Sequence, residues 1–449
     1  MNRRDLLASG VGITLSLRHR LPGWIARPTP SPAQLRWHRE ELALFVHFGI
    51  NTFTDREWGD GRESPALFNP SALNARQWAR AARAAGARAM VLTAKHHDGF
   101  CLWPTRTTTH SVASSPWRGG AGDVVAEFVA ACRAEGLGAG LYLSPWDRHE
   151  PSYGDSPRYN ELYIAQLTEL LTRYGRLVEV WFDGANGEGP NGKRQQYDWT
   201  RVFGTVRRLQ PEAVMFSDAG PDVRWIGNED GVAGETCWAT IDPAAVPWPG
   251  YDAPGVRELL QRGDPAGSAW RPGETDVSIR PGWFYHADQD AKVRDPANLL
   301  ELHFTSVGRN SKLLLNVPPT PDGLLHGTDV RRLAEFGALR SRLFAWDGGA
   351  GAKKRIDGDG RRIALAFPAP VTFDVVGLEE DIRHGQVVSG YRVEVDIGGS
   401  WRTVSRGTTI GHRKLDRIAP VTAAAVRLVV EGALEAPRIA RLSVHKRAD

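Results

Sequence analysis

The sequence predicts an α/β protein, a (β/α)8-type barrel followed by a C-terminal antiparallel β-sandwich, and three observations support this. Between about residues 35 and 340, short apolar runs alternate with amphipathic helical segments, the pattern of repeated βα units around a parallel sheet. About eight such runs favour a closed barrel over an open sheet. From about residue 352 the runs become short and alternating, with Gly, Asp and Pro turns between them, which is typical of antiparallel β structure.

The barrel elements can be placed in order along the chain. Strands are expected at 42–46, 89–93, 138–143, 177–182, 213–216, 277–279 and 313–317, with a further one near 223–226. Helices are expected between them at 75–85, 124–135, 161–174, 199–209, 297–307 and 329–343. Because no strand is followed by Gly-x-Gly-x-x-Gly, a dinucleotide-binding fold is disfavoured.

The C-terminal part is expected to form its own domain. Strands are expected at 363–367, 371–376, 391–395 and 425–430. The loops at 381–386 and 407–413 resemble those of discoidin-like modules that are often attached to such barrels. We therefore expect a catalytic barrel at 34–345 and a discoidin-like sandwich at 346–449, with packing against the barrel favoured over independent sugar binding.

The N-terminus has the pattern of an export signal rather than of a fold element. Arg3 and Arg4 precede a modestly apolar stretch at 6–17 that is too short to span a bilayer as a stable helix. This resembles a twin-arginine signal, and the Pro-rich run at 27–32 reads as a linker. We expect residues 1–33 to be signal and linker, and the protein to be exported to a periplasm, with no membrane span in the mature form; a cytoplasmic protein with a chance Arg-Arg pair is the alternative.

Composition excludes several function classes. The 449 residues carry a net charge of +4, from 56 basic and 52 acidic side chains that are evenly mixed, so neither a nucleic acid nor a membrane surface is the expected partner. Three cysteines without a Cys-x-x-Cys spacing support no zinc site and no disulfide framework. Sixteen tryptophans, many beside polar residues, are compatible with sugar binding because indole faces pack against the C–H faces of sugars.

Polar groups follow successive predicted strands. Asp183 ends the run Leu-Val-Glu-Val-Trp-Phe-Asp-Gly, His47 follows the first strand, and His96 and His97 follow the second. Later strands end in Ser-Pro-Trp at 144–146 and in Arg-Pro-Gly-Trp at 280–283. Barrel enzymes place their catalytic groups at this C-terminal rim. An Asp-Gly pair alone is more often a turn, but the repeated pattern predicts an enzyme in which Asp183 acts.

The residue types narrow the chemistry. His96 and His97 are adjacent and would point to opposite sides of a strand, so a metal-dependent hydrolase built on His96, His97 and Asp98 is the less favoured alternative. A serine nucleophile lacks its Gly-x-Ser-x-Gly motif. Carboxylate chemistry on a polyol remains, and a retaining glycosidase needs two carboxyls. Asp183 can be the nucleophile and Glu229, beside aromatic residues, the proton donor; rivals to Glu229 are Asp230, Glu235, Glu57 and Glu274.

Several motifs occur together in a characteristic order. They are His-Phe-Gly at 47–49, Glu-Trp at 57–58, Lys-His-His-Asp-Gly-Phe at 95–100, Trp-Phe-Asp-Gly at 181–184 and Leu-Leu-Asn-Val-Pro-Pro at 314–319. Through most of residues 35–330 the chain thereby resembles glycoside hydrolase family 29, the retaining α-L-fucosidases. The resemblance implies that Asp183 is the nucleophile and that the fucose ring is held by a set of five residues, His47, Glu57, Trp58, His96 and His97.

Two further motifs resemble one subgroup of that family. Trp-Ile-Gly-Asn-Glu at 225–229 and Ser-Ile-Arg-Pro-Gly-Trp-Phe-Tyr at 278–285 are similar to enzymes acting on α-1,3 and α-1,4 fucosyl branches. This implies Glu229 as acid/base and places Trp283, Arg280 and Tyr142 among the candidate binding residues. The expected function is exo-release of L-fucose from fucosylated oligosaccharides by double displacement, without cofactor or metal. A fucose-binding protein without turnover is the second alternative.

Overall fold

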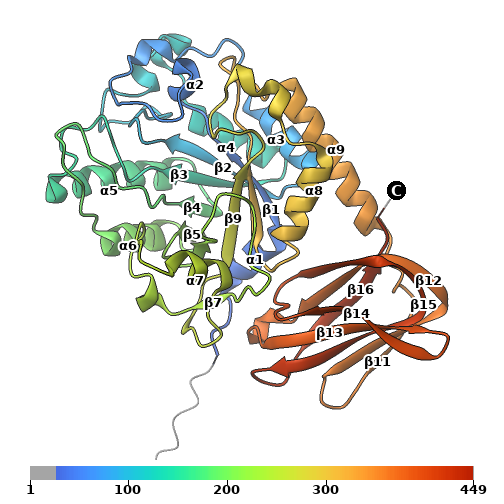
Figure 1. Ribbon diagram of the computed structural model, residues 1–449. Coiled ribbons are helices and arrows are strands. Elements are labelled where there is room, and N and C mark those ends of the chain that lie inside the picture. The colour runs from blue at the N-terminus through green and yellow to red at the C-terminus, as the bar shows by residue number, and fades with distance from the viewer. Residues whose placement is uncertain (1–26, 448–449) are drawn as a thin grey trace, which may run out of the picture.

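The computed structural model describes residues 27–447 of the chain (Figure 1). The predicted export signal lies almost wholly outside the described residues, in 1–26. Within 27–447, no helix combines the length and the apolarity needed to cross a membrane.

A closed barrel of eight parallel strands forms the larger part of the molecule (Figure 1). Its strands pair in the order β1-β10-β9-β6-β5-β4-β3-β2, and β1 closes the ring by pairing with both β10 and β2. They are β1 (Leu42–Val46), β2 (Ala89–Lys95), β3 (Gly138–Leu143), β4 (Glu179–Trp181), β5 (Val214–Ser217), β6 (Val223–Trp225), β9 (Gly273–Ser278) and β10 (Lys312–Asn316). The predicted barrel is confirmed, and all eight expected strand positions overlap observed strands.

Helices surround the barrel, and each of the six predicted ones overlaps an observed helix. The ring contains α3 (Ala75–Ala85), α4 (Val124–Ala134), α5 (Ser156–Arg173), α6 (Trp199–Leu209), α8 (Pro296–Thr305) and α9 (Gly327–Ala345). Two short helices, α2 (Asn51–Thr54) and α7 (Val256–Arg262), lie in loops that follow strands β1 and β6.

One further helix, α1 (Pro32–Glu40), precedes the first strand and was not predicted. The Ser31 hydroxyl accepts from the Gln34 amide at 3.2 Å, and the Gln34 side chain accepts from the Ser31 amide at 2.9 Å. This reciprocal capping box, with Pro32 in the first turn, starts a helix directly after the Pro-rich run. The linker therefore ends in a helix.

Charged side chains occupy the interior of the barrel. Lys312 Nζ lies 2.9 Å from Glu179 and 3.7 Å from Glu274, and all three side chains are buried. Glu274 also accepts from the indole nitrogens of Trp181 at 3.1 Å and Trp37 at 3.2 Å. Because each charge has partners, the cluster avoids the cost of an unpaired buried ion. The indole of Trp181 bonds to Glu274 in this cluster, and the same side chain lines the candidate site at the C-terminal ends of the strands.

The C-terminal strands form an antiparallel domain, as predicted. They are β11 (Lys353–Ile356), β12 (Arg362–Glu380), β13 (Val388–Ile397), β14 (Ser400–Gly407), β15 (Lys414–Ala433) and β16 (Ile439–His445). The predicted strands at 363–367 and 371–376 are one strand, β12, which continues through irregular pairing with β15. The two ends of β12 pair with different neighbours, β11 at one and β16 at the other, and side chains from both ends share one apolar core.

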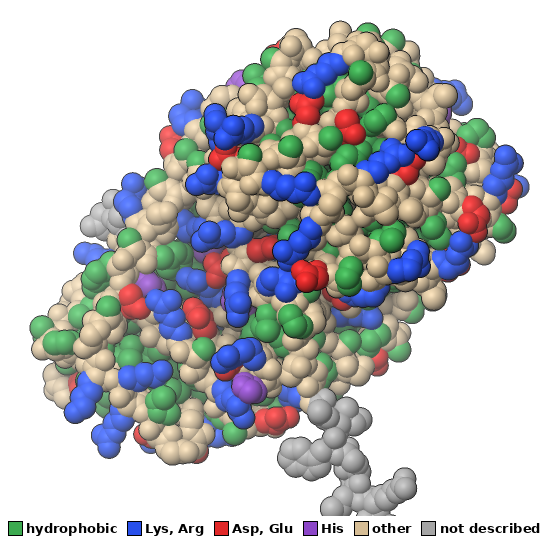
Figure 2. Space-filling view, turned by 180° about the vertical axis from the view of Figure 1, so that it is seen from behind, with side chains coloured by type: hydrophobic (Ala, Val, Ile, Leu, Met, Phe, Trp, Pro, Cys, Tyr) green, Lys and Arg blue, Asp and Glu red, His purple; other side chains and the backbone are tan. Residues whose placement is uncertain are grey.

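The antiparallel domain packs directly on the barrel (Figure 1). Arg309, after α8, forms a β-bridge with Lys414 at the start of β15. Asn310 donates to the carbonyl of Cys237 at 3.0 Å, and the Cys237 amide donates to the Thr409 hydroxyl at 2.9 Å. Viewed from behind, acidic side chains lie among the basic ones on the surface of the molecule (Figure 2).

Candidate active site

A cavity of about 180 Å³ opens at the C-terminal ends of the barrel strands. Loops after β1, β2, β4, β6 and β9 all contribute to it, the arrangement expected of a barrel active site. It is lined by Phe45, His47, Glu57, Trp58, His96, His97, Trp181, Asp183, Ala185, Glu229, Asp276 and Trp283. Eight of the ten site residues predicted from the sequence are in this lining; Tyr142 and Arg280 are not.

Asp183 is held from two sides just beyond the end of β4. The Tyr142 hydroxyl donates to Oδ2 at 3.1 Å, and the amide of Ala185 donates to Oδ1 at 2.7 Å. His97 Nε2 lies 3.9 Å from Oδ2. Tyr142 therefore acts on the site through Asp183. With both oxygens fixed, the carboxylate is oriented toward the cavity before any ligand arrives.

The three histidines are buried, and burial favours their uncharged forms. His47 Nδ1 lies 2.8 Å from Asn316 Oδ1, and His97 Nδ1 lies 2.7 Å from Ser144 Oγ. Burial lowers the pKa of His47 to about 3, and burial together with the neighbouring imidazoles lowers the pKa of His96 well below its ordinary value. Burial also lowers the pKa of His97, against the opposing effect of Asp183. A neutral imidazole offers one donor and one acceptor, which suits sugar hydroxyls.

Glu57 connects two loops of the cavity wall. Its carboxylate accepts from the backbone amides of Trp283 at 2.8 Å and Phe284 at 3.2 Å, and lies 2.6 Å from His286 Nε2. The loop after β1 is thereby joined to the loop after β9. Because these contacts occupy Glu57, its geometry suits holding the Trp283 wall better than donating a proton.

Trp58 stands at the cavity mouth with 59% of its surface exposed. Its ring meets those of His97 and Trp146 edge-on, at centroid distances of 6.2 and 5.9 Å. An exposed indole beside buried polar groups is a surface on which a sugar ring can pack.

Glu229 lies in the loop after β6, on the open side of the cavity. Partial burial raises its pKa, and the negative charge of Asp183 raises it further, whereas Trp283 favours the carboxylate. Of its predicted rivals, Glu274 belongs to the buried cluster inside the barrel and Glu235 lines a different cavity. Among the carboxyls proposed as proton donor from the sequence, Glu229 thus combines a place in the cavity lining with a raised pKa.

Asp276, on β9, was missed by the sequence analysis although it lines the cavity. It is 4% exposed, and its Oδ1 accepts from the Trp225 indole at 2.8 Å. Burial raises its pKa well above the ordinary value, and the charge of Glu229 adds to this. The available signal was the alternation Glu274-Thr275-Asp276, because period-2 spacing places both carboxyls on the inner face of one strand.

Asp218, after β5, is a second carboxyl that the sequence analysis missed. Its Oδ2 accepts from the Gly250 amide at 3.0 Å, and burial together with the charge of Asp183 raises its pKa to about 6. It does not line the cavity but lies close enough to influence Asp183 electrostatically.

Arg280 has a different position from the one predicted. Its guanidinium lies 2.9 Å from Asp329 and 2.8 Å from Asp290, and over the ring of Tyr285. The side chain is fully buried and does not line the cavity. We correct its expected role from sugar contact to support of the 281–285 turn, which carries Trp283.

The residues of the metal-hydrolase alternative are not arranged around one point. His96 and His97 line the cavity but Asp98 does not. Asp98 Oδ1 accepts from the Phe100 amide at 2.7 Å, and burial raises the Asp98 pKa to about 7. Among residues 27–447, no group of three or more His, Cys, Asp or Glu side chains is placed to hold a metal ion.

A family model described as α-L-fucosidase matches residues 33–341, which include every strand of the barrel. The chain belongs to the α-L-fucosidase family, glycoside hydrolase family 29. The enzyme is accordingly an α-L-fucosidase, and the predicted family is confirmed. No comparison assigns roles to its individual side chains.

Relatives match over nearly the whole chain. α-L-Fucosidase 1 of Arabidopsis thaliana is 44% identical, over 93% of this chain and 87% of its own length. A crystal structure of a glycoside hydrolase 29 family member from a rumen bacterium is 40% identical, with a TM-score of 0.88 over 94% of this chain and 78% of its own. A Ruminococcus gnavus fucosidase of the same family, solved in complex with fucose, is 31% identical, with a TM-score of 0.84 over 94% of this chain and 96% of its own.

Proposed function

We propose that this α-L-fucosidase releases terminal L-fucose with retention of configuration, using Asp183 as nucleophile and Glu229 as acid/base. The observation that carries the proposal is the presence of both carboxyls in the lining of one small cavity. Their environments differ in the way such a pair requires, because Asp183 accepts two hydrogen bonds while burial and the charge of Asp183 raise the pKa of Glu229.

The reaction takes place in two displacements. Asp183 attacks the anomeric carbon as Glu229 protonates the departing glycosidic oxygen, so a fucosyl-enzyme ester forms and the aglycone leaves. Glu229, now ionised, removes a proton from water, which attacks the same carbon and breaks the ester. L-Fucose departs, and both carboxyls return to their starting states.

The remaining lining residues fit the proposed ligand. His47, His96 and His97, as neutral imidazoles, would bond ring hydroxyls. Trp58 and Trp283 offer apolar surface for the ring and its methyl group. We further propose α-1,3- and α-1,4-linked fucosyl branches as substrates, supported by the motifs at 225–229 and 278–285.

Two measurements test the mechanism and the linkage. Proton NMR of the first-formed fucose should show the α-anomer before mutarotation; initial formation of the β-anomer would exclude a double displacement. A panel of 1,2-, 1,3- and 1,4-linked fucosyl oligosaccharides with an aryl fucoside should show preference for the 1,3 and 1,4 branches. Cleavage of the aryl fucoside alone would contradict the linkage assignment.

Glu229 can be separated from its rivals by chemical rescue. Glu229→Gln should turn over an aryl fucoside slowly, and azide should restore the rate by attacking the fucosyl-enzyme without needing a general base. The product should be a fucosyl azide of retained configuration. Asp230→Asn, the matched control on the next residue, should behave as the unaltered enzyme does; rescue confined to the Asp230 variant would reverse the assignment.

We also propose that the enzyme is exported through the paired arginines Arg3 and Arg4. Fractionation of cells producing the full chain and its Arg3→Lys, Arg4→Lys variant would test this. Equal cytoplasmic retention of both would contradict export.

A further inference from the structure

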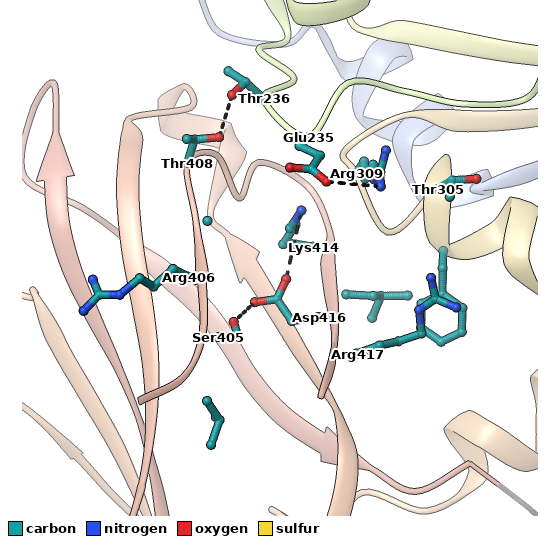
Figure 3. A pocket seen from close by; sticks show the side chains of 14 residues that line it. Glu235, Thr236, Thr305, Arg309, Ser405, Arg406, Thr408, Lys414, Asp416 and Arg417 are labelled. Carbon is teal, nitrogen blue, oxygen red and sulfur yellow. Dashed lines mark hydrogen bonds and ion pairs between the residues drawn. The ribbon is translucent and has the colours of Figure 1, made fainter. Parts of the chain in front are cut away.

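A second cavity lies where the barrel meets the antiparallel domain (Figure 3). Its volume is about 650 Å³, and it shares no lining residue with the active-site cavity. One wall comes from the barrel, at 235–236 and 304–309, and the other from the ends of β14 and β15 at 404–408 and 414–417. We call it the junction cleft.

The two walls of the junction cleft are fixed to each other by hydrogen bonds. The Leu415 amide donates to the carbonyl of Gly308 at 3.0 Å, and the Asn310 amide donates to that of Arg413 at 2.9 Å. At the opposite side, the hydroxyls of Thr236 and Thr408 lie 2.7 Å apart (Figure 3). The concave shape is therefore built into the folded chain and needs no ligand to form it.

Lys414 projects into the cleft without a close acceptor (Figure 3). Its side chain is 11% exposed, and its nearest acidic neighbour, Asp416, lies 4.0 Å from Nζ, beyond hydrogen-bond distance. Within residues 27–447, this loose ion pair is the contact found for the ammonium. Burial lowers the pKa of Lys414; the charge of Asp416 opposes this, and that of Arg309 adds to it. A desolvated ammonium that lacks acceptors is a favourable place for an anionic oxygen.

Asp416 forms only a loose ion pair with Lys414, because its oxygens are held by other groups. Its oxygens accept from the Tyr391 hydroxyl, each at 2.9 Å, and from the Ser405 hydroxyl. Burial also raises the pKa of Asp416. The carboxyl is thus engaged with hydroxyl donors, and Lys414 keeps most of its hydrogen-bonding capacity.

The lining contains more basic than acidic side chains, but two of the basic ones are paired with acids outside it, Arg406 with Glu431 and Arg417 with Glu301. It contains four basic side chains, Arg309, Arg406, Lys414 and Arg417, against two acidic ones, Glu235 and Asp416. Glu235 is 85% exposed and lies 3.7 Å from Arg309, so its screening of the cleft is weak. Lys414 and Arg309, whose acidic partners are only loosely placed, are therefore the basic groups that can meet an anionic oxygen in the cleft.

We propose that the junction cleft binds an acidic saccharide, whose carboxylate or sulfate is held by Lys414 and Arg309. The volume lies within the range of about 300–1,000 Å³ typical of small-molecule sites, so the cleft accommodates more than an inorganic anion. Hydroxyl side chains on both walls, at Thr236, Thr305 and Thr408, suit the remaining sugar hydroxyls. This binding goes beyond fucose release and does not depend on it.

Binding can be measured by calorimetry and ligand-observed NMR on the complete enzyme. The probes are 3′-sialyllactose, 3′-sulfolactose, neutral lactose and inorganic sulfate. We expect at least one acidic lactose to bind, with lactose and sulfate each at least about 10-fold weaker. If lactose bound as tightly as the acidic lactoses, charge would have no part in recognition. If sulfate bound as tightly as they do, the cleft would be a site for inorganic anions and not for a saccharide. Absence of binding by both acidic lactoses, or displacement of the bound probe by fucose, would overturn the proposal.

Variants locate the binding in the cleft. Lys414→Met should weaken binding of the acidic probe by at least about 10-fold. Lys414→Arg should retain this binding because the charge remains. Lys353→Met, an exposed lysine on β11, is the matched control and should not alter binding. Fucosidase activity on an aryl fucoside should be unchanged in all three. If Lys414→Met unfolds, Arg309→Gln provides the same test, and unaltered affinity in the folded variant would contradict the proposal.

Discussion

The hydroxyl of Tyr142 lies 3.1 Å from Oδ2 of Asp183, and this contact connects the interior of β3 to the end of β4. Tyr142→Phe removes one of the two donors to the carboxylate without changing the packing of the ring. We expect kcat/KM to fall about 10-fold, the effect of one lost hydrogen bond to a charged group. Tyr163→Phe is the matched control, because that hydroxyl donates to the backbone of Leu143 within the barrel wall. An equal loss of activity in both variants would show a general effect of packing.

Asp183→Asn should abolish turnover while leaving the fold intact. The amide oxygen can still accept from the Ala185 amide and the NH2 group can donate to the Tyr142 hydroxyl, but the side chain cannot attack the anomeric carbon, so kcat should fall by about 10³-fold or more. Initial rates on an aryl fucoside and thermal unfolding measure the two effects. Asp252→Asn, at an exposed aspartate, is the control. Chelator treatment of the unaltered enzyme should leave its rate unchanged; a lost rate restored by a divalent cation would favour the metal alternative.

The pH profile should depend on Glu229. Its raised pKa keeps the acid protonated at higher pH than an ordinary carboxyl, so kcat/KM should fall as pH rises through that value. In Glu229→Gln this alkaline limb should disappear, with a loss of about 10²–10⁴-fold in rate. In Asp183→Asn, removal of the neighbouring negative charge should lower the pKa of Glu229, which carboxyl NMR can measure. A pKa unaltered by Asp183→Asn would refute the electrostatic link between them.

Asp276→Asn should be tolerated better than Asp183→Asn. Burial and the charge of Glu229 raise the Asp276 pKa and so favour the protonated acid, which the amide resembles in shape and in hydrogen bonding. We expect kcat/KM to stay within about 10-fold, whereas Asp276→Leu, which cannot accept from the Trp225 indole, should lose more than 10-fold. A loss in Asp276→Asn as large as in Asp183→Asn would mean that Asp276 acts as an anion.

Lys95→Met should destabilise the barrel strongly. Lys95 Nζ lies 2.9 Å from Asp147 and from Gln166, and the lysine side chain is fully buried. Removing one member of a buried ion pair leaves the other charge unpaired, at a cost of about 3–5 kcal/mol in the free energy of unfolding. Denaturant unfolding measures the difference. Lys292→Met, which loses only an exposed pair with Asp288, should change stability by less than about 1 kcal/mol.

Most of the barrel could be predicted because its strands are continuous apolar runs and its helices have clear periodicity. The expected strand 42–46 and the expected helices 75–85 and 199–209 match the observed bounds, because the local sequence marks clearly where each element begins and ends. The two expected strands at 363–367 and 371–376 form one strand, β12, and this could not be predicted. Pro368 and Pro370 lie between them, and two prolines in such a pattern indicate a turn. The strand β15, which is distant in the sequence, pairs with the chain on both sides of that segment, and this pairing makes the two parts one strand.

The candidate site was predictable where residues follow strand ends and unpredictable where they depend on partners far along the chain. Arg280 follows β9, where a residue that contacts the ligand is expected. Its side chain nevertheless points to Asp329, 49 residues away in the sequence. Asp276 lies within a strand, and only barrel closure shows that it faces the cavity. The junction cleft needs two domains to exist and therefore has no local sequence signal.

Glu57 has an implication for how related enzymes can diverge. By fastening the loop after β1 to the loop after β9, it couples any change in one loop to the position of Trp283 in the other. Insertions in either loop therefore disturb the fucose cavity itself. The carbonyl of Glu188, in the loop after β4, instead accepts from the Trp146 indole in the loop after β3, so we expect changes around Glu188 to leave the Trp283 wall in place.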